Sequence, residues 1–114
     1  MKSQKIIIAG AGIGGLAAAS CLMKAGHRVE IYEQAPQLGE IGAGIQISAN
    51  AMHVMRHIGV GEQIDQIGVR PEAYVFRLHD TGEVIQRFSL SAEHERMHGA
   101  PYTQLHREIG RAHV

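Results

Sequence analysis

Cysteine, tryptophan, proline and aromatic residues are all scarce in this chain of 114 residues. It contains one cysteine, no tryptophan and three prolines, and aromatic residues make up 4% of it. Because Cys21 has no second cysteine to pair with, an internal disulfide is excluded, and we expect a reducing, cytoplasmic setting. The content of 45% hydrophobic and 19% charged residues is typical of a folded globular protein, and the length allows one small domain.

An excess of charge of either sign is also absent. The charges of eleven basic and eleven acidic residues cancel, so the net charge gives no indication of a nucleic-acid or membrane partner. Lys2 and Lys5 precede an apolar stretch that loosely resembles a secretory signal. That stretch is too rich in glycine for a signal and too short for a membrane span, so we expect it to belong to the mature, folded protein.

The first 33 residues predict a strand, a helix and a second strand. Residues 5–9 are a β-branched run typical of a parallel strand buried on both faces. Residues 16–25 are rich in good helix formers, and Gly26 is placed to end that helix. Residues 27–33 alternate as a second strand would, and a right-handed crossover makes the two strands parallel neighbours.

A glycine-rich turn joins the first strand to the helix. Gly10, Gly12 and Gly15 satisfy the pattern G-x-G-x-x-G. The first glycine permits the tight turn, the second lets a pyrophosphate approach the backbone, and the third lets helix and strand pack closely. Because a helix directs its N-terminal N–H groups at such phosphates, the pattern predicts a dinucleotide site.

Glu33 stands at the end of the second strand, where its carboxylate can accept hydrogen bonds from both ribose hydroxyls of an ADP group. A carboxylate there would repel a 2′-phosphate, which disfavours NADP at this site. FAD and NAD carry the same ADP group, so these residues leave both open.

The rest of the chain predicts a loop, a helix and a hairpin. We expect a loop over residues 34–44 and a helix from Ser48 or Asn50 to about His57, broken by Gly59 and Gly61. The apolar positions expected on that helix include Val54 and Met55. Residues 73–78 and 83–90 form two strand-like runs joined by a turn at residues 80–82. Residues 91–101 look polar and irregular.

Two short motifs imitate other enzymes. His94 to His98 matches H-E-x-x-H, the helix of zinc proteases, but Gly99 and Pro101 are expected to stop a helix there, so no metal site is predicted. Residues 80–82 match the aspartic-protease triplet and indicate a turn.

Three segments resemble one enzyme family. Residues 40–51, EIGAGIQISANA, resemble the segment after the second strand in FAD-dependent aromatic-ring hydroxylases of the salicylate and 3-hydroxybenzoate hydroxylase type. Residues 55–60 are similar to that family's helix-and-glycine pattern, and residues 102–107 to its strand ending in His-Arg. The resemblance implies an α/β fold: a Rossmann-like FAD-binding βαβ unit with a following helix and β-hairpin, truncated from a larger two-domain flavoprotein.

The resemblance also implies roles for single residues. The glycine turn would lie on the pyrophosphate, Glu33 on the ribose, and Arg107 near the phosphates or the ribityl chain. Ala43 and Gly44 would run close to the flavin, and Gln46 would face the flavin or the substrate. The full set of cofactor-binding residues expected is Gly10, Gly12, Ile13, Gly14, Gly15, Glu33, Ala43, Gly44, Gln46 and Arg107. No catalytic base can be named.

The implied reaction is hydroxylation of a small phenolic or other aromatic acid, with O2 as oxidant and NADH or NADPH as co-substrate. In this family the reduced flavin forms a flavin hydroperoxide that transfers one oxygen atom to the ring. Two alternatives remain: another FAD-dependent oxidoreductase of the same fold, such as an epoxidase or an oxidase, and an NAD-binding regulatory module. The segment 42–50 argues against the amine oxidases, whose corresponding loop tends to be more basic and richer in glycine.

The C-terminus departs from the family pattern. After His-Arg the family continues with an acidic residue and a leucine that open a long helix, whereas residues 109–114 here are IGRAHV. This hexapeptide matches one translated frame of a common sequencing adaptor. We therefore expect residues 1–108 to be the N-terminal part of the FAD/NAD(P)-binding domain and residues 109–114 a non-native tail. We also expect this polypeptide alone to be inactive and to bind FAD poorly.

Overall fold

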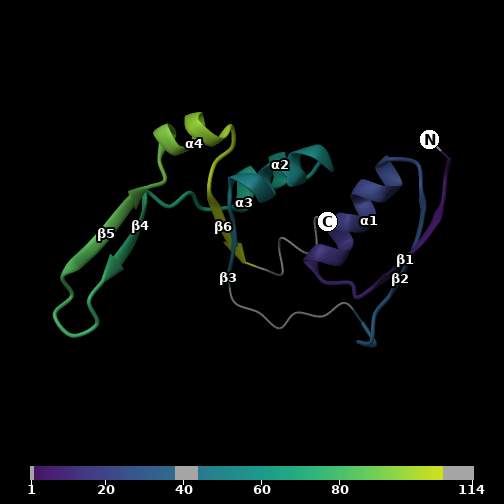
Figure 1. Cartoon of the computed structure of the whole chain (residues 1–114), viewed down its shortest axis with the longest axis horizontal. Helices are drawn as coiled ribbons and strands as arrows, with labels where there is room; N and C mark the ends of the chain where they lie inside the picture. Colours follow the sequence, from purple (N-terminus) through teal and green to yellow (C-terminus); the bar gives the residue numbers. More distant parts are fainter. Residues whose placement is uncertain (1, 38–43, 107–114) are drawn as a thin grey trace.

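A parallel βαβ unit opens the chain in the computed structural model, which describes residues 2–37 and 44–106 (Figure 1). Strand β1 (Lys5–Ala9), helix α1 (Ile13–Lys24) and strand β2 (Arg28–Tyr32) follow one another, and β1 pairs in parallel with β2. The predicted strands and their parallel pairing are confirmed. The helix begins at Ile13, three residues before the predicted start, because the later glycines of the turn already belong to its first turn.

Among the described residues, α1 covers one face of the two-stranded sheet, and the other face is exposed. Ile6 and Ile8 are half-buried on the face toward α1, whereas Ile7, on the other face, is 61% exposed. The prediction of a strand buried on both faces is therefore wrong for the chain as described. Within the described ranges, no helix is long and apolar enough to cross a membrane.

A second pair of strands brings distant segments together. Strand β3 (Gly44–Ile47) pairs antiparallel with β6 (Thr103–His106), so that Gly44 lies opposite His106. On the other side of β6, Val69 forms an isolated bridge with Gln104. The sequence did not predict β3, since four residues carry little periodicity of their own.

The hydrophobic core lies between this strand pair and helices α2 (Ala49–His57) and α3 (Gly61–Ile67). Met52 and Ile64 are 0% exposed, and Met55, one turn after Met52, is 6% exposed. The start of α2 after Ser48 is confirmed. The apolar position assigned to Val54 is wrong, because this side chain is 39% exposed on the opposite face of the helix.

The two glycines after α2 behave differently. Gly59 follows the end of α2, as predicted. Its φ of +89° is a backbone conformation that residues other than glycine rarely adopt. The prediction that Gly61 is a helix breaker is wrong, because Gly61 is the first residue of α3, a helix that the sequence did not predict. A Cβ at Gly61 would lie 2.7 Å from Cγ of Arg56, so this glycine allows the two helices to approach.

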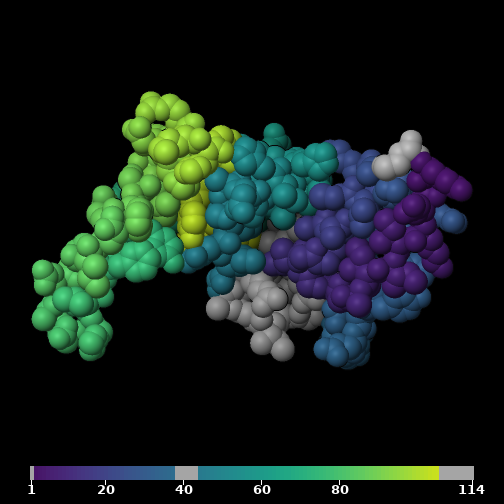
Figure 2. Space-filling view, in the orientation of Figure 1, coloured from purple at the N-terminus to yellow at the C-terminus, as the bar shows by residue number. Residues whose placement is uncertain are grey.

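A β-hairpin and a short helix complete the described chain. Strands β4 (Ala73–Arg77) and β5 (Val84–Ser89) form the predicted hairpin, which projects from the body of the molecule (Figures 1 and 2). The expectation of irregular structure over residues 91–101 is wrong, because residues Ala92–His98 form helix α4. Gly99, at φ +76°, caps this helix, so it stops the helix only after two turns.

The H-E-x-x-H segment is therefore helical, so the expectation that Gly99 and Pro101 would prevent a helix there is wrong. His94 and His98 lie one turn apart on α4, and their ring centroids are 4.4 Å apart. The residues that the structure describes contain no group of three or more histidine, cysteine or acidic side chains that could hold a metal ion. The Asp80–Gly82 triplet lies in the hairpin turn, as predicted.

Candidate functional site

The glycine turn leaves β1 and doubles back toward β2. Gly10 has φ +105°, a left-handed conformation that glycine adopts without steric cost. Its N–H donates a hydrogen bond of 2.7 Å to the carbonyl oxygen of Tyr32 at the end of β2. The turn is thus fixed to the carboxyl ends of both strands, the edge where ligands bind in open parallel sheets.

Gly15 allows α1 to pack directly on this turn. A Cβ at Gly15 would lie 2.1 Å from the carbonyl oxygen of Gly10, a distance that no side chain tolerates. This is the close packing that the sequence predicted for the third glycine of the pattern.

Gly12 and Gly14 line the open side of the turn. A Cβ at either position would meet no heavy atom within 4 Å. Ile13 between them is the first residue of α1, a helix of 12 residues with no acidic side chain in its first turn. Backbone N–H groups at a helix start lack intrahelical partners, so the open space beside Gly12 and Gly14 suits a pyrophosphate.

Glu33 connects the end of β2 to the glycine turn. Its Oε2 accepts a hydrogen bond of 2.7 Å from the N–H of Ala11, and its Oε1 accepts one of 3.2 Å from the N–H of Ala35. Ala11 is 4% exposed and Glu33 is half-buried, so their contact is partly buried. Sequence reasoning placed Glu33 beside the turn but missed Ala11, because any small residue fits the pattern at that position.

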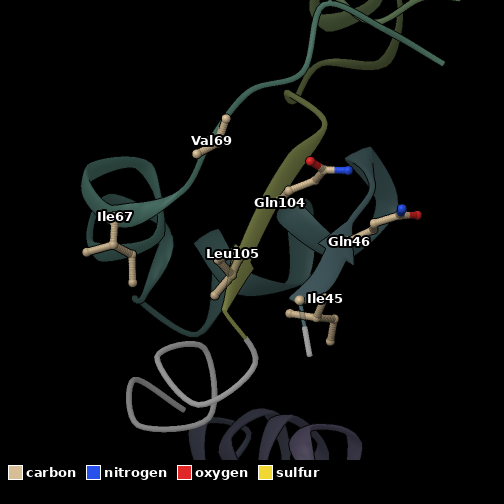
Figure 3. Close-up of a pocket in the computed structure, with 7 residues that line it drawn as sticks. Ile45, Gln46, Ile67, Val69, Gln104 and Leu105 are labelled. Carbon is tan, nitrogen blue, oxygen red and sulfur yellow. The ribbon is translucent and has the colours of Figure 1, made fainter. Parts of the chain in front are cut away.

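A cavity of about 510 Å³ lies beside β3 and β6 (Figure 3). Two of the residues predicted to bind the cofactor, Gly44 and Gln46, line it from β3. The full lining is Gly44, Ile45, Gln46, Ile67, Val69, Gln104 and Leu105. A Cβ at Gly44 would lie 3.6 Å from the carbonyl oxygen of Leu105, an ordinary contact, so space alone does not require this glycine.

Gln46 is held by a residue far away in the sequence. The Tyr102 hydroxyl donates a hydrogen bond of 2.7 Å to Oε1 of Gln46 across 56 positions of the chain. Burial raises the pKa of Tyr102 above its usual 10.0, and repulsion from Tyr74 adds to the shift, so the hydroxyl remains a donor at neutral pH. The resemblance named the segment around Tyr102 for its His-Arg ending and gave no sign of this contact.

The structure brings most of the predicted site residues into two groups, the glycine turn with Glu33 and the β3 end with Gln46. Gly44 lies opposite His106 at one end of the strand pair, and α1 is the helix nearest that end (Figures 1 and 3). Ala43 and Arg107 lie outside the described residues.

Comparison with known sequences decides the family. The profile of a family described as "FAD binding domain" matches residues 3–112, nearly the whole chain. The chain belongs to the FAD-binding domain family. The Rossmann-like α/β architecture expected from the sequence is thereby confirmed, as is the resemblance to flavin-dependent aromatic hydroxylases.

Curated relatives of this FAD-binding domain are aromatic hydroxylases. It is 43% identical over 104 residues to 3-hydroxybenzoate 6-hydroxylase 1 of Aquipseudomonas alcaligenes, covering 91% of this chain and 26% of the relative. It is 37% identical over 106 residues to 6-hydroxynicotinate 3-monooxygenase of Pseudomonas fluorescens, covering 93% and 28% respectively. The domain therefore spans little more than a quarter of the length of these relatives.

A solved structure shows the same arrangement of elements. The crystal structure of Klebsiella pneumoniae HpxO complexed with FAD and uric acid superposes on the domain with a TM-score of 0.77. The sequences are 31% identical, and the match covers 96% of this chain and 27% of that one.

Proposed function

We propose that this domain binds the ADP portion of FAD at the glycine turn. Gly10, Gly12, Ile13, Gly14 and Gly15 would contact the pyrophosphate through the backbone, as the open space beside Gly12 and Gly14 allows. The observation that carries the proposal is the contact from Glu33 to the N–H of Ala11, which holds a carboxylate at the edge of this open turn. A carboxylate so placed suits the ribose hydroxyls of the nucleotide.

The flavin end would lie along the start of β3. Ala43, Gly44 and Gln46 are the residues proposed there, and Arg107 is proposed near the phosphates or the ribityl chain. Support comes from the cavity that Gly44 and Gln46 line and from the fixed orientation of the Gln46 amide. Because Oε1 of Gln46 accepts from Tyr102, its NH2 group is left to donate to an acceptor on the flavin or the substrate.

For the whole protein we propose an NAD(P)H-dependent monooxygenase that hydroxylates a phenolic or other aromatic acid in the cytoplasm. FAD, when bound, would supply the redox and oxygen-transfer chemistry, with NADH or NADPH as reductant and O2 as the oxygen source. The chain's own residues would bind and orient the cofactor. The supporting fact is that the relatives named above are hydroxylases of hydroxybenzoate and hydroxynicotinate.

Because the 114-residue chain alone is expected to bind FAD poorly, the nucleotide assignment is tested on a protein extended to the length of the relatives, by titration calorimetry with ADP, 2′-phosphorylated ADP, NAD and FAD. We expect ADP to bind at least about tenfold more tightly than its 2′-phosphate, because the phosphate would be repelled by Glu33. Equal affinity for the two nucleotides would contradict the role of Glu33. Tighter binding of NAD than of FAD would favour the NAD-binding module instead.

Substitution of Gln46 tests the flavin end separately. Gln46→Ala should weaken FAD binding about three- to tenfold and leave ADP binding unchanged, since one hydrogen bond to the flavin end is lost. The matched control is Gln86→Ala, an exposed glutamine on β5, which should change neither. A loss of ADP affinity in Gln46→Ala would show that Gln46 supports the fold rather than the flavin.

A protein extended to the length of the relatives tests the activity. We expect NAD(P)H consumption to depend on an aromatic acid and to yield one hydroxylated product per O2 consumed. NAD(P)H oxidation that forms only hydrogen peroxide with every aromatic acid tried would favour an oxidase.

A further inference from the structure

The two groups of residues proposed to bind the cofactor lie on two separate units of the described chain. The glycine turn and Glu33 lie at the edge of the sheet formed by β1 and β2. Gly44 and Gln46 lie on β3, which pairs with β6 in a different sheet. No strand pairing between described residues therefore fixes one group relative to the other.

Helix α1 joins the two units, because it contacts α2 (Figure 1). Ala17, in the second turn of α1, packs against the hydrophobic core that lies between α2, α3 and the β3–β6 pair. The distance between packed helices is set by the side chains at their contact, and a residue as small as alanine permits a close approach. The position of α1 on the core therefore depends on the size of the side chain at this position.

Lys24 makes a second contact between the two helices, at their C-terminal ends. Its Nζ donates a hydrogen bond to the backbone carbonyl oxygen of His57, the last residue of α2, across 33 positions of the chain. Among the described side chains of α1, Lys24 alone forms a hydrogen bond with α2. The packing of Ala17 is thus supplemented by one directed polar contact.

The electrostatics of helix ends favour this contact. The last carbonyl oxygens of a helix lack intrahelical partners and carry a partial negative charge. Lys24 is itself in the last turn of α1, so its ammonium group lies at the C-terminal ends of both helices. A cation at that place offsets the repulsion between two partially negative ends.

Both helices lead directly to the residues proposed for the cofactor. Helix α1 begins at Ile13, in the turn proposed for the pyrophosphate. Helix α2 follows Ser48, which comes directly after β3 and the proposed flavin end. A change in how α1 packs on α2 therefore changes the separation between the pyrophosphate residues and the flavin residues.

We propose that Lys24 is a positioning residue for FAD. It holds α1 on α2 at the spacing at which one FAD molecule reaches the glycine turn and β3 together. Lys24 lies roughly 16 Å along the helix axis from Ile13, so it acts through the helices and does not touch the phosphates. This role rests on the function proposed above, in which the two units bind the two ends of FAD.

The effect expected is that of a link between two binding modules. A ligand that is held at both ends gains affinity when the two modules are kept at the matching distance, because the second contact becomes intramolecular. A looser link reduces this gain and leaves each separate contact intact. ADP reaches only the glycine turn, so its affinity does not depend on the link. The affinity for FAD relative to ADP is therefore the quantity that reports on Lys24.

Lys24→Met tests the role in a protein extended to the length of the relatives. Methionine keeps an unbranched side chain and removes both the charge and the hydrogen-bond donors. Titration calorimetry should show that the affinity for FAD falls at least about threefold and that the affinity for ADP is unchanged. The control is Lys5→Met, which removes an exposed lysine of the same βαβ unit and should change neither affinity.

Lys24→Arg should restore the affinity for FAD to within about twofold of the parent value, because arginine keeps the charge and can also donate to a carbonyl oxygen. Failure of arginine to restore any of the loss would contradict a role of the charged donor.

Ala17→Leu tests the packing of α1 on the core. The larger side chain should push α1 away from the core and lower the affinity for FAD at least about threefold more than the affinity for ADP. Ala18→Leu is the matched control, because Ala18 is exposed on the same helix. Urea unfolding of each variant checks that the protein remains folded.

The parent protein separates failure of this role from failure of the proposed function. A parent that binds FAD no more tightly than ADP would contradict binding at both units, and with it the role of Lys24. A parent that prefers FAD, with the same preference retained in Lys24→Met, would contradict the role of Lys24 alone. Equal losses of ADP and FAD affinity in Lys24→Met would also overturn it, because they would show that Lys24 supports the βαβ unit and not the spacing.

Discussion

The carboxylate of Glu33 accepts a hydrogen bond of 2.7 Å from the backbone N–H of Ala11, 22 residues earlier in the chain. This contact ties the end of β2 to the glycine turn, beside the hydrogen bond from Gly10 to Tyr32. The residue proposed to bind the ribose therefore also shapes the turn proposed to bind the pyrophosphate. A substitution at Glu33 should affect both.

Glu33→Gln should lower the affinity for ADP by about five- to thirtyfold, because a charged acceptor becomes a neutral one at the ribose and at Ala11. It should also reduce the discrimination against 2′-phosphorylated ADP, since the repelling charge is gone. Calorimetry with both nucleotides measures each effect. Glu30→Gln is the control, because Glu30 lies on β2, shortly before Glu33, in an exposed pair with Lys5.

Two glycine substitutions should separate packing from binding. Gly15→Ala should reduce the free energy of unfolding by about 1–3 kcal/mol or more, because its Cβ would lie 2.1 Å from the carbonyl oxygen of Gly10 and must push helix and turn apart. Urea unfolding followed by circular dichroism measures the change.

Gly14→Ala should behave in the opposite way. Its Cβ meets no heavy atom, and alanine is the better helix former, so stability should hold or rise by up to about 1 kcal/mol. ADP binding should nevertheless weaken, because the methyl group enters the space proposed for the pyrophosphate. Unchanged ADP affinity in Gly14→Ala would place the phosphates elsewhere.

Substitutions on α2 should show which face supports the core. Met52→Ala should lower the free energy of unfolding by about 2–5 kcal/mol, because Met52 is 0% exposed among Met55, Ile64 and their neighbours. Val54→Ala should cost less than about 1 kcal/mol, since Val54 is 39% exposed. Similar losses in both variants would mean that the helix face is assigned wrongly.

The elements that the sequence predicted are those specified by neighbouring residues. The β-branched run, the glycine turn and Gly26 define β1, α1 and β2 within one short segment, and the hairpin follows from two strand-like runs around a turn. Strand β3 escaped prediction because its partner is β6, nearly 60 residues later, and pairing alone makes it a strand. Helix α4 escaped because it has only seven residues and depends on another helix.

That dependence is visible at the end of α4. The His53 ring and the Arg56 guanidinium, both on α2, hydrogen-bond the carbonyl oxygens of His98 and Gly99. Within the site, the glycines and Glu33 were predictable because each follows a fixed local geometry. The contact of Gln46 with Tyr102 was not, because it joins segments that only the folded chain brings together.

Tyr102→Phe should change how stability depends on pH. Because burial raises the pKa of Tyr102 above 10.0 in the folded chain, the folded state holds this proton more tightly than the unfolded state does. Its contribution to stability is therefore complete below about pH 10 and is lost as the pH rises through the raised folded-state value.

The variant should lose about 0.5–1.5 kcal/mol at pH 7, where the hydrogen bond to Gln46 disappears. Above pH 10 it should approach the parent protein, because that protein loses the contribution of Tyr102 while phenylalanine has no proton to release. Urea unfolding at pH 7, 10 and 11 measures the difference, and Tyr32→Phe is the control, since Tyr32 is 61% exposed. A stability gap between parent and Tyr102→Phe that widens above pH 10 would contradict the raised pKa, because it would mean that the unfolded state holds the proton more tightly.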